Sequence, residues 1–296
     1  MTKLNVPFYV STNNKHLECL AVFLDLFNYY IPEQEVRVLG YDEPSYDLSD
    51  NCKFISMGEQ GDVSEWSTDL RKYFLNSDDD YFIYGTEDVF FYDKPKIDYI
   101  NYLAKKMKHN PQVGRLQLTD GAEENNCTLE TSHHYRVSLL EYVDDQPWGN
   151  FKLFKQKWGS NYTLNTQLSL WNKEYFLKYC IDGMTPWQFE SQASERAKMN
   201  PDYEVWMVDG AIPILKKEGY RGTTSKEVEI LGLDIKDDFI YEIPDGRVVN
   251  SKQLRDLAVA ELGVKWGEAE WEHTTYWLER VSPELKQNVL SGTIVS

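Results

Sequence analysis

The chain has 296 residues, of which 14% are aromatic, and a formal net charge of −17 at pH 7. A chain of this length can bury a substantial core and forms one large domain or two smaller ones. A negative field of this size repels phosphate backbones, so we expect no broad nucleic-acid-binding surface and at most a local basic patch such as residues 105–109.

The first half of the chain alternates short apolar runs with amphipathic stretches. The runs predict strands over residues 6–10, 35–40, 53–57, 80–84 and 113–118. The stretches with apolar residues at helical spacing predict helices over residues 16–30, 64–75 and 97–108. Strands that alternate with helices across short turns are typical of a doubly wound, mostly parallel sheet.

The second half has a weaker pattern. The expected elements are a strand-like run at 135–142, a strand at 166–171, a helix at 173–181, a polar helix ending near 199, a strand at 204–208 and a helical region from 251 onward. The sequence shows no internal repeat and no clear linker. We therefore expect one α/β domain over residues 1–220 and a mostly helical C-terminal extension over residues 221–296, packed on it.

Two adjacent acids, Glu87 and Asp88, follow the aromatic strand at 80–84. Open α/β sheets bind ligands at the carboxyl ends of their strands, and a strand that ends in acids delivers them to that edge. Carboxylate oxygens suit Mg²⁺ or Mn²⁺ holding a diphosphate. A solvated acidic turn explains the same residues equally well.

Several common motifs are missing. No Gly-x-Gly-x-x-Gly follows the first strand, and the chain has neither a P-loop nor a Gly-x-Ser-x-Gly elbow, which argues against the NAD, ATP and hydrolase classes that use them. The four cysteines lie far apart without a Cys-x-x-Cys pair, as expected of free thiols in a reducing compartment. With no signal peptide and no apolar run of about 18 residues, the sequence predicts no membrane span and a cytoplasmic location, in the host cell if the chain is viral.

Three further stretches occur in a distinctive order. A polar turn at 11–14 follows the first strand, Trp66-Ser-Thr-Asp-Leu-Arg71 opens the helix before the acidic strand, and Thr185-Pro-Trp-Gln-Phe-Glu190 follows a strand–helix unit. In this order they resemble the GT-A class of nucleotide-sugar glycosyltransferases, most closely the small bacterial and viral enzymes. The resemblance covers about residues 4–220 and depends more on order and spacing than on any single motif.

The resemblance implies a GT-A-like fold with a donor side. The residues it places there are Ser11, Thr12, Asn13, Tyr41, Asp42, Trp66, Arg71 and Glu87. Ser11, Thr12 and Asn13 would hold the nucleoside, and Tyr41 and Asp42 would contact the base or the ribose. Arg71 would pair with a phosphate, although an exposed helix cation explains it equally well.

The resemblance also implies a metal ligand, Asp88, with Glu87 assisting. The family usually has Asp-x-Asp, whereas this chain has Thr86-Glu87-Asp88. Cationic side chains that replace the metal are therefore an open alternative to Mg²⁺ or Mn²⁺.

On the acceptor side the resemblance implies that Glu190 is the general base and that Trp187 stacks on a sugar. Asp120 and Asp209, each at an expected strand end, are secondary acceptor candidates. The alternative interpretation of this stretch is an ordinary helix start, with Pro186 in the first turn, the aromatic residues in the core and Glu190 near the N-terminus.

Together these features predict a glycosyltransferase that moves a sugar from a nucleoside-diphosphate sugar, with a UDP-sugar expected, to an acceptor hydroxyl. A base opposite the leaving group implies inversion at the anomeric carbon. The acceptor would be a polysaccharide precursor or, in a viral protein, a modified DNA base. The alternative is a non-catalytic sugar- or nucleotide-binding protein of the same fold.

Overall fold

The chain divides into two compact units, which are described separately. The computed structural model describes residues 3–89, 91, 94–119, 128–130, 136–138, 140–144, 153–156, 163–199, 202–213, 240–243 and 247–250. The first unit contains the described residues of Met1–Asn14, Ile31–Thr86 and Asp93–Ile214. The second contains those of Lys15–Tyr30, Glu87–Tyr92 and Leu215–Ser296.

The first unit is built on a mixed sheet. Among the described residues it has nine strands in the order β3-β2-β1-β4-β10-β5-β11-β9-β8. Their bounds are β1 (Phe8–Ser11), β2 (Val36–Gly40), β3 (Cys52–Ser56), β4 (Tyr81–Thr86), β5 (Val113–Thr119), β8 (Leu140–Asp144), β9 (Leu153–Gln156), β10 (Ser169–Asn172) and β11 (Glu204–Ile212). Strands β1 to β5 and β11 run in one direction, whereas β10 and β9 run in the opposite direction. This confirms the predicted α/β fold with a mostly parallel sheet.

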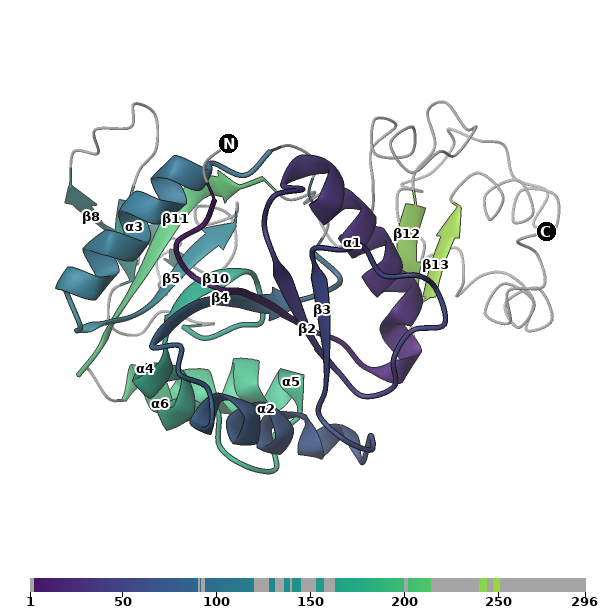
Figure 1. Cartoon of the computed structure of the whole chain (residues 1–296). Coiled ribbons are helices and arrows are strands. Elements are labelled where there is room, and N and C mark those ends of the chain that lie inside the picture. The colour runs from purple at the N-terminus through teal and green to yellow at the C-terminus, as the bar shows by residue number, and fades with distance from the viewer. Residues whose placement is uncertain are drawn as a thin grey trace, which may run out of the picture. The chain divides into compact units, whose positions relative to one another are not determined.

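Helices cover both faces of this sheet. They are α2 (Trp66–Leu75), α3 (Ile97–His109), α4 (Lys173–Tyr179), α5 (Pro186–Gln188), a π-helical stretch (Phe189–Ala193) and α6 (Ser194–Lys198), with a short 3₁₀ turn (Val63–Glu65) before α2. Figure 1 shows α2, α4, α5 and α6 together on one face and α3 on the other. Each of α2 and α3 is amphipathic: the buried residues of α2, including Trp66, Leu70 and Phe74, recur at helical spacing.

The face covered by α2 and α4 holds an aromatic core. The Phe74 and Phe82 rings stack with centroids 4.1 Å apart, and Phe176 meets Phe74 edge-on at 5.0 Å. Offset-stacked and edge-to-face aromatic pairs add about 0.5–1.5 kcal/mol each beyond the area they bury. Many of the chain's aromatic residues therefore serve to join α2 and α4 to the sheet.

The predicted elements of residues 3–119 are all present, with ends shifted by one or two residues. Two differences later in the chain affect the predicted site residues. The expected strand at 166–171 begins only at Ser169, because the preceding residues bond to other elements instead. The strand expected to end at 208 continues to Ile212 as β11, so Asp209 lies inside a strand and not at its end.

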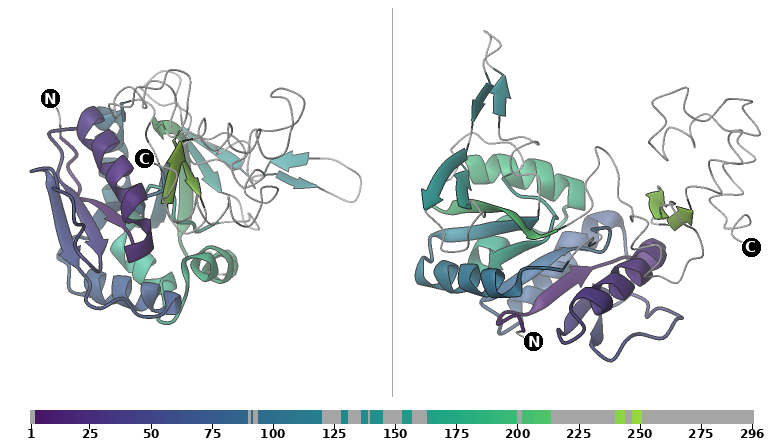
Figure 2. Two further views of the ribbon diagram at one scale, coloured as in Figure 1. Left: turned by 90° about the vertical axis from the view of Figure 1, so that its right-hand side faces the viewer. Right: turned by 90° about the horizontal axis from the view of Figure 1, so that it is seen from above.

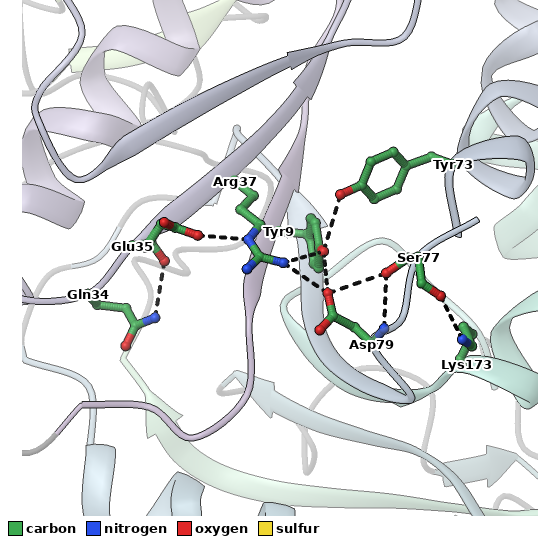
Figure 3. A network of polar contacts seen from close by, with 8 residues as sticks. All are labelled: Tyr9, Gln34, Glu35, Arg37, Tyr73, Ser77, Asp79 and Lys173. Carbon is green, nitrogen blue, oxygen red and sulfur yellow. Dashed lines mark hydrogen bonds and ion pairs between the residues drawn. The ribbon is translucent and has the colours of Figure 1, made fainter. Parts of the chain in front are cut away.

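A polar network joins the amino ends of the strands (Figure 3). The Tyr9 hydroxyl donates to Asp79 Oδ2 at 2.6 Å, and Arg37 Nη1 donates to both groups at 2.8 and 2.9 Å. Tyr73 and Ser77 add contacts from α2 and from the turn before β4. The network ties β1, β2 and α2 together, with a carboxylate facing a guanidinium.

The second unit contains α1 (Leu17–Tyr30) and the antiparallel pair β12 (Ile240–Ile243) and β13 (Arg247–Asn250). Phe23, Phe27 and Phe91 pack there with ring centroids 5.5–6.1 Å apart. The helical region expected from residue 251 lies outside the described residues, and the described part of 221–296 is strand. The boundary between 1–220 and 221–296 stays a prediction.

A further antiparallel pair, β6 (Thr128–Glu130) and β7 (Arg136–Ser138), forms a small sheet apart from the nine-stranded one. Figure 2 shows this pair extending away from the main sheet. With β8, it replaces the single strand expected at 135–142. Within the described part of the chain, no helix has both the length and the apolar character needed to cross a membrane.

Candidate functional site

The carboxyl ends of β1 and β4 are neighbours, since Ser11 pairs with Thr86 in the parallel register. The polar turn predicted to hold a nucleoside leaves β1 at this point. Ser11 and Thr12 are nearly buried, and the Ser11 hydroxyl lies 2.8 Å from the hydroxyl of Tyr84. The backbone N–H of Thr12 donates to Leu39 O of the next strand at 2.9 Å. Of the three predicted nucleoside contacts, only Asn13 is partly exposed.

Hydrogen bonds connect this turn to the loops after the next two strands. Asn14 Nδ2 donates to Asp42 Oδ2 at 2.6 Å, and the Asp42 backbone N–H donates back to Asn14 Oδ1 at 3.0 Å. The Asn14 N–H donates to Gln60 Oε1 at 2.8 Å. The loops after β1, β2 and β3 thus form one hydrogen-bonded rim that includes Asp42, and its predicted contact with a base or ribose stays a prediction.

Tyr41 directly follows β2 and contacts α2. Its hydroxyl donates to Asp69 Oδ2 of α2 at 3.0 Å, and only 6% of the residue is exposed. Burial and the nearby Asp69 carboxylate raise the pKa of Tyr41 above its ordinary value. Tyr41 is therefore a neutral donor that fixes the β2 loop to α2.

Glu190 lies beside the carboxyl end of β4, in the π-helical stretch Phe189–Ala193. Its Oε1 accepts two hydrogen bonds from Thr166, one from the backbone N–H and one from the hydroxyl, each 2.8 Å long. The carbonyl of Thr166 in turn accepts from the N–H of Thr86, the last residue of β4, at 3.2 Å. Among the described residues no hydrogen bond reaches Oε2 of Glu190, so one carboxylate oxygen is fixed and the other stays available.

The helix that carries Glu190 starts as the alternative interpretation of its sequence predicts. Thr185 and Gln188 form a capping box, and Pro186 occupies the first turn. Phe189 is fully buried, but Trp187 is 69% exposed and so does not join the core. An exposed indole one helical turn from a carboxylate fits the stacking role that the resemblance implies.

The other two helix residues predicted on the donor side make contacts within the protein. Trp66 is 9% exposed and meets Phe189 edge-on at 5.7 Å. Arg71 Nη1 donates to the carbonyls of Leu177 and Cys180 at the end of α4. These bonds satisfy carbonyls left open at a helix C-terminus and account for the position of Arg71 without a phosphate.

Glu87 and Asp88 lie in the second unit, and both are nearly buried. Glu87 Oε1 lies 2.8 Å from His16 Nδ1. Among the described residues no group of three or more His, Cys, Asp or Glu side chains gathers as a metal site. Mg²⁺ in phosphate-binding sites needs only one or two carboxylates plus waters and phosphate oxygens, so the side-chain chemistry of this acidic pair suits such a metal.

A second polar cluster surrounds Arg115 on β5, which is fully buried. Its Nε and Nη2 donate to Ser169 Oγ at 3.1 and 2.9 Å, and its Nη1 donates to Thr163 O at 3.0 Å. Its Nη2 also donates to the side-chain oxygens of Gln117 and Asn165. Burial lowers the pKa of Arg115 to about 10, against the opposing effects of Tyr175 and Glu190.

Four residues that make these polar contacts were not predicted from the sequence: Asn14, Gln60, Arg115 and Thr166. Arg115 had a signal, since Arg115, Gln117 and Thr119 alternate with leucines and mark a polar face on a strand expected to be apolar. Thr166 had none, because its role depends on contacts with residues far away in the sequence. Asp120 lies outside the described residues, and the side chain of Asp209 is not among those described.

Comparison with known proteins identifies no family. No family model matches the sequence, and no curated protein matches it. Similar solved structures include a cytidylyltransferase from Leptospira borgpetersenii serovar Hardjo-bovis, with a TM-score of 0.36 and 9% identity over 67% of this chain and 72% of the other.

Two further structures have the same TM-score of 0.36. One is the CMP:2-keto-3-deoxy-manno-octonic acid synthetase complexed with CTP, at 12% identity over 70% of this chain and 89% of the other. The other is the 4-diphosphocytidyl-2C-methyl-D-erythritol synthase from Anaerococcus prevotii, at 8% identity over 73% of this chain and 94% of the other. TM-scores this low carry no information about the activity of this chain, and the resemblance to glycosyltransferases stays a prediction.

Proposed function

We propose that this chain is a glycosyltransferase that moves a sugar from a nucleoside-diphosphate sugar to an acceptor hydroxyl. The observation that carries the proposal is the carboxylate of Glu190, with Oε1 held by two hydrogen bonds from Thr166 and Oε2 without a hydrogen-bond partner among the described residues. It lies at the carboxyl edge of a mostly parallel sheet, where α/β folds bind their substrates.

In this proposal Glu190 is the general base. An acceptor hydroxyl would donate its hydrogen bond to Oε2 and lose its proton there as its oxygen attacks the anomeric carbon. The anomeric carbon–oxygen bond to the diphosphate breaks in the same displacement, and the nucleoside diphosphate leaves with the bonding electrons. Attack from the side opposite the leaving group inverts the configuration. Trp187 would stack on a sugar ring of the acceptor.

The donor side of the proposal uses the rim formed by the loops after β1, β2 and β3. Asn13 is partly exposed there and Asp42 is exposed, and Asn14 and Gln60 fix their loops by hydrogen bonds. Open loop ends of parallel strands are where nucleotides bind in such folds. A UDP-sugar is the first donor to test. A Mg²⁺ or Mn²⁺ held by Asp88 stays an expectation from the resemblance, and adding Mn²⁺ to the donor tests it.

The test compares Glu190→Gln with the unmodified chain, using radiolabelled sugar nucleotides and a panel of glycan acceptors. Glutamine keeps an oxygen for Thr166 but cannot take a proton, so we expect kcat to fall by about 10³-fold with nucleoside-diphosphate affinity unchanged. Glu195→Gln is the matched control, because Glu195 lies on α6, directly after the stretch that carries Glu190, and its side chain is 69% exposed. Equal losses in the two variants would contradict the proposal.

The same experiment separates the enzyme from a binding protein of the same fold. Thermal shift with UDP, GDP and their sugars, with and without Mn²⁺, measures binding independently of transfer, since a ligand that binds only the folded state raises its stability. A stabilising shift without transfer to any acceptor or to water favours the binding protein. No shift with any nucleotide removes the nucleotide-sugar proposal altogether.

A further inference from the structure

The residues Thr163–Ser169, which we name the bridging segment, connect three parts of the first unit. The Leu118 N–H donates to Leu168 O at 3.1 Å, and Thr119 Oγ1 donates to Gln167 Oε1 at 2.9 Å, which fixes the segment along β5. On its other side, Ser194 Oγ accepts from the Leu164 N–H and donates to the Leu164 carbonyl, both at 2.9 Å. Ser194 begins α6, directly after the stretch that carries Glu190.

Arg115 holds the start and the end of this segment. It bonds to Thr163, Asn165 and Ser169, and its guanidinium lies 5.2 Å from the ring centre of Trp171. All its hydrogen-bond acceptors among the described residues are neutral. Burying a cation that bonds to no carboxylate costs free energy, because the cation loses its hydration. Packing alone therefore does not explain an arginine at this position. It can make this many bonds because guanidinium presents five donors in a fixed plane.

Gly85 on β4 shows how closely the segment lies against the sheet. A Cβ at this position would lie 3.0 Å from Leu168 N and 3.1 Å from Leu168 Cα. These contacts are with backbone atoms, which do not move aside as a flexible side chain does. The segment therefore lies directly on β4, with its Thr166 carbonyl accepting from Thr86.

We infer that Thr166 is the positioning residue of Glu190, and that the bridging segment exists to hold it there. This inference rests on the proposed function of Glu190 as a base. Thr166 is 8% exposed, and it spends both its backbone donor and its side-chain donor on one oxygen of Glu190. Two bonds to Oε1 fix the plane of the carboxylate and aim Oε2, and Arg115 keeps Thr166 from moving.

The orientation of a base matters more for the rate than for binding. Proton transfer requires the base within hydrogen-bond reach of the proton, and small displacements of catalytic groups lower rates by large factors. A misaimed Oε2 would lower kcat without changing the affinity for the donor, which binds through other residues. Thr166 acts through Glu190 and touches no reacting atom itself.

The test is a double-mutant cycle of Thr166→Val and Glu190→Gln, with Thr166→Ser as the rescuing variant. Valine keeps the branched shape and the backbone donor but lacks the hydroxyl. We expect kcat to fall about tenfold, the loss typical of a single hydrogen bond to a charged group, with the nucleoside-diphosphate Kd unchanged. Serine keeps the hydroxyl, and we expect it to restore most of the rate.

In the Glu190→Gln background, Thr166→Val should lower the residual rate by less than twofold, because residues that act as a unit are not additive. Thr68→Val is the matched control, since Thr68 Oγ1 accepts a hydrogen bond from Gly183 N–H away from Glu190. Equal tenfold losses in both backgrounds, or failure of serine to rescue, would overturn the inference and leave the proposed function standing. An unmodified chain that transfers no sugar would overturn both.

Discussion

The first unit contains two arginine clusters, and they are built differently. Arg37, at the amino ends, faces the carboxylates of Glu35 and Asp79, and its side chain is 30% exposed. Burial lowers the pKa of Arg37, but the hydrogen bonds to Glu35 and Tyr9 outweigh this and raise it overall. Arg115, on β5, is fully buried with neutral hydrogen-bond partners, and burial lowers its pKa.

This difference indicates which of the two clusters contributes to the stability of the fold alone. The carboxylates bonded to Arg37 offset the free-energy cost of partly burying its charge, so the fold alone accounts for this cluster. A buried cation bonded only to neutral groups loses its hydration without a compensating ion pair, so a benefit must come from what it holds. The Arg37 cluster should therefore govern stability alone, and the Arg115 cluster should also govern the rate of the proposed transfer.

The largest expected effect comes from exchanging each arginine for methionine. Arg115→Met releases both ends of the bridging segment, and we expect kcat to fall by about 10²-fold. Its stability should fall as well, by about 1–3 kcal/mol, because the buried acceptors bonded to Arg115 lose their donor. Arg37→Met should lower stability by about 1–3 kcal/mol while leaving kcat unchanged. Urea unfolding and initial rates of transfer measure both quantities, and equal profiles for the two variants would refute the division.

Gly85→Ala tests whether the bridging segment affects the rate, because it displaces the segment from its place on β4. The added methyl group meets the backbone of Leu168, so either the segment or β4 must shift. We expect a loss of about 1–3 kcal/mol from this overpacking and a fall in kcat of about tenfold. Gly58→Ala is an informative control for activity, since it lies in a surface turn at a φ of 112° with open space around it and should affect stability alone. An unchanged rate in Gly85→Ala would show that Glu190 does not depend on the segment.

Tyr9→Phe removes the hydroxyl at the centre of the Arg37 cluster. We expect a loss of about 1 kcal/mol at neutral pH and no change in kcat. Burial and the bond to Asp79 raise the pKa of Tyr9 above 10. The folded state then keeps the proton at pH values where the unfolded chain loses it, so stability must fall as the pH rises above 10. The Phe variant lacks this contribution, and its unfolding free energy should approach that of the unmodified chain between pH 10 and 11.

The sequence predicted the fold better than the site, for a physical reason. Strand and helix patterns are local, so the order of elements and the acids after β4 were readable from residues close together. The alternation of Arg115, Gln117 and Thr119 was also readable, although its partners were not. The bond from Thr166 to Glu190 spans 24 residues and that from Arg115 to Ser169 spans 54, and such pairings follow from tertiary packing, which no local pattern encodes.

Arg71 illustrates the same limit from the opposite side. Its place in a motif predicted a phosphate contact, and its neighbours in sequence gave no sign of α4. The structure brings the end of that helix to its guanidinium, where two carbonyls lack intrahelical partners. A cation on a helix surface can serve a ligand or a neighbouring helix end equally well, and only the fold decides which one lies within reach.

The smallest expected effect comes from changing Thr185. It tests whether the start of the helix or the bonds from Thr166 orient the Glu190 carboxylate. The capping box of Thr185 and Gln188 starts the helix that carries the carboxylate, with bonds of 2.9 and 3.2 Å. Thr185→Ala should cost about 1 kcal/mol in stability, whereas Thr185→Ser keeps the cap and should cost little. If Thr166 and the bridging segment position Glu190, then kcat should stay within twofold in both variants, since the cap acts on the helix start and Thr166 acts on the carboxylate itself. A tenfold loss in Thr185→Ala, restored by serine, would show instead that the start of the helix aims the base.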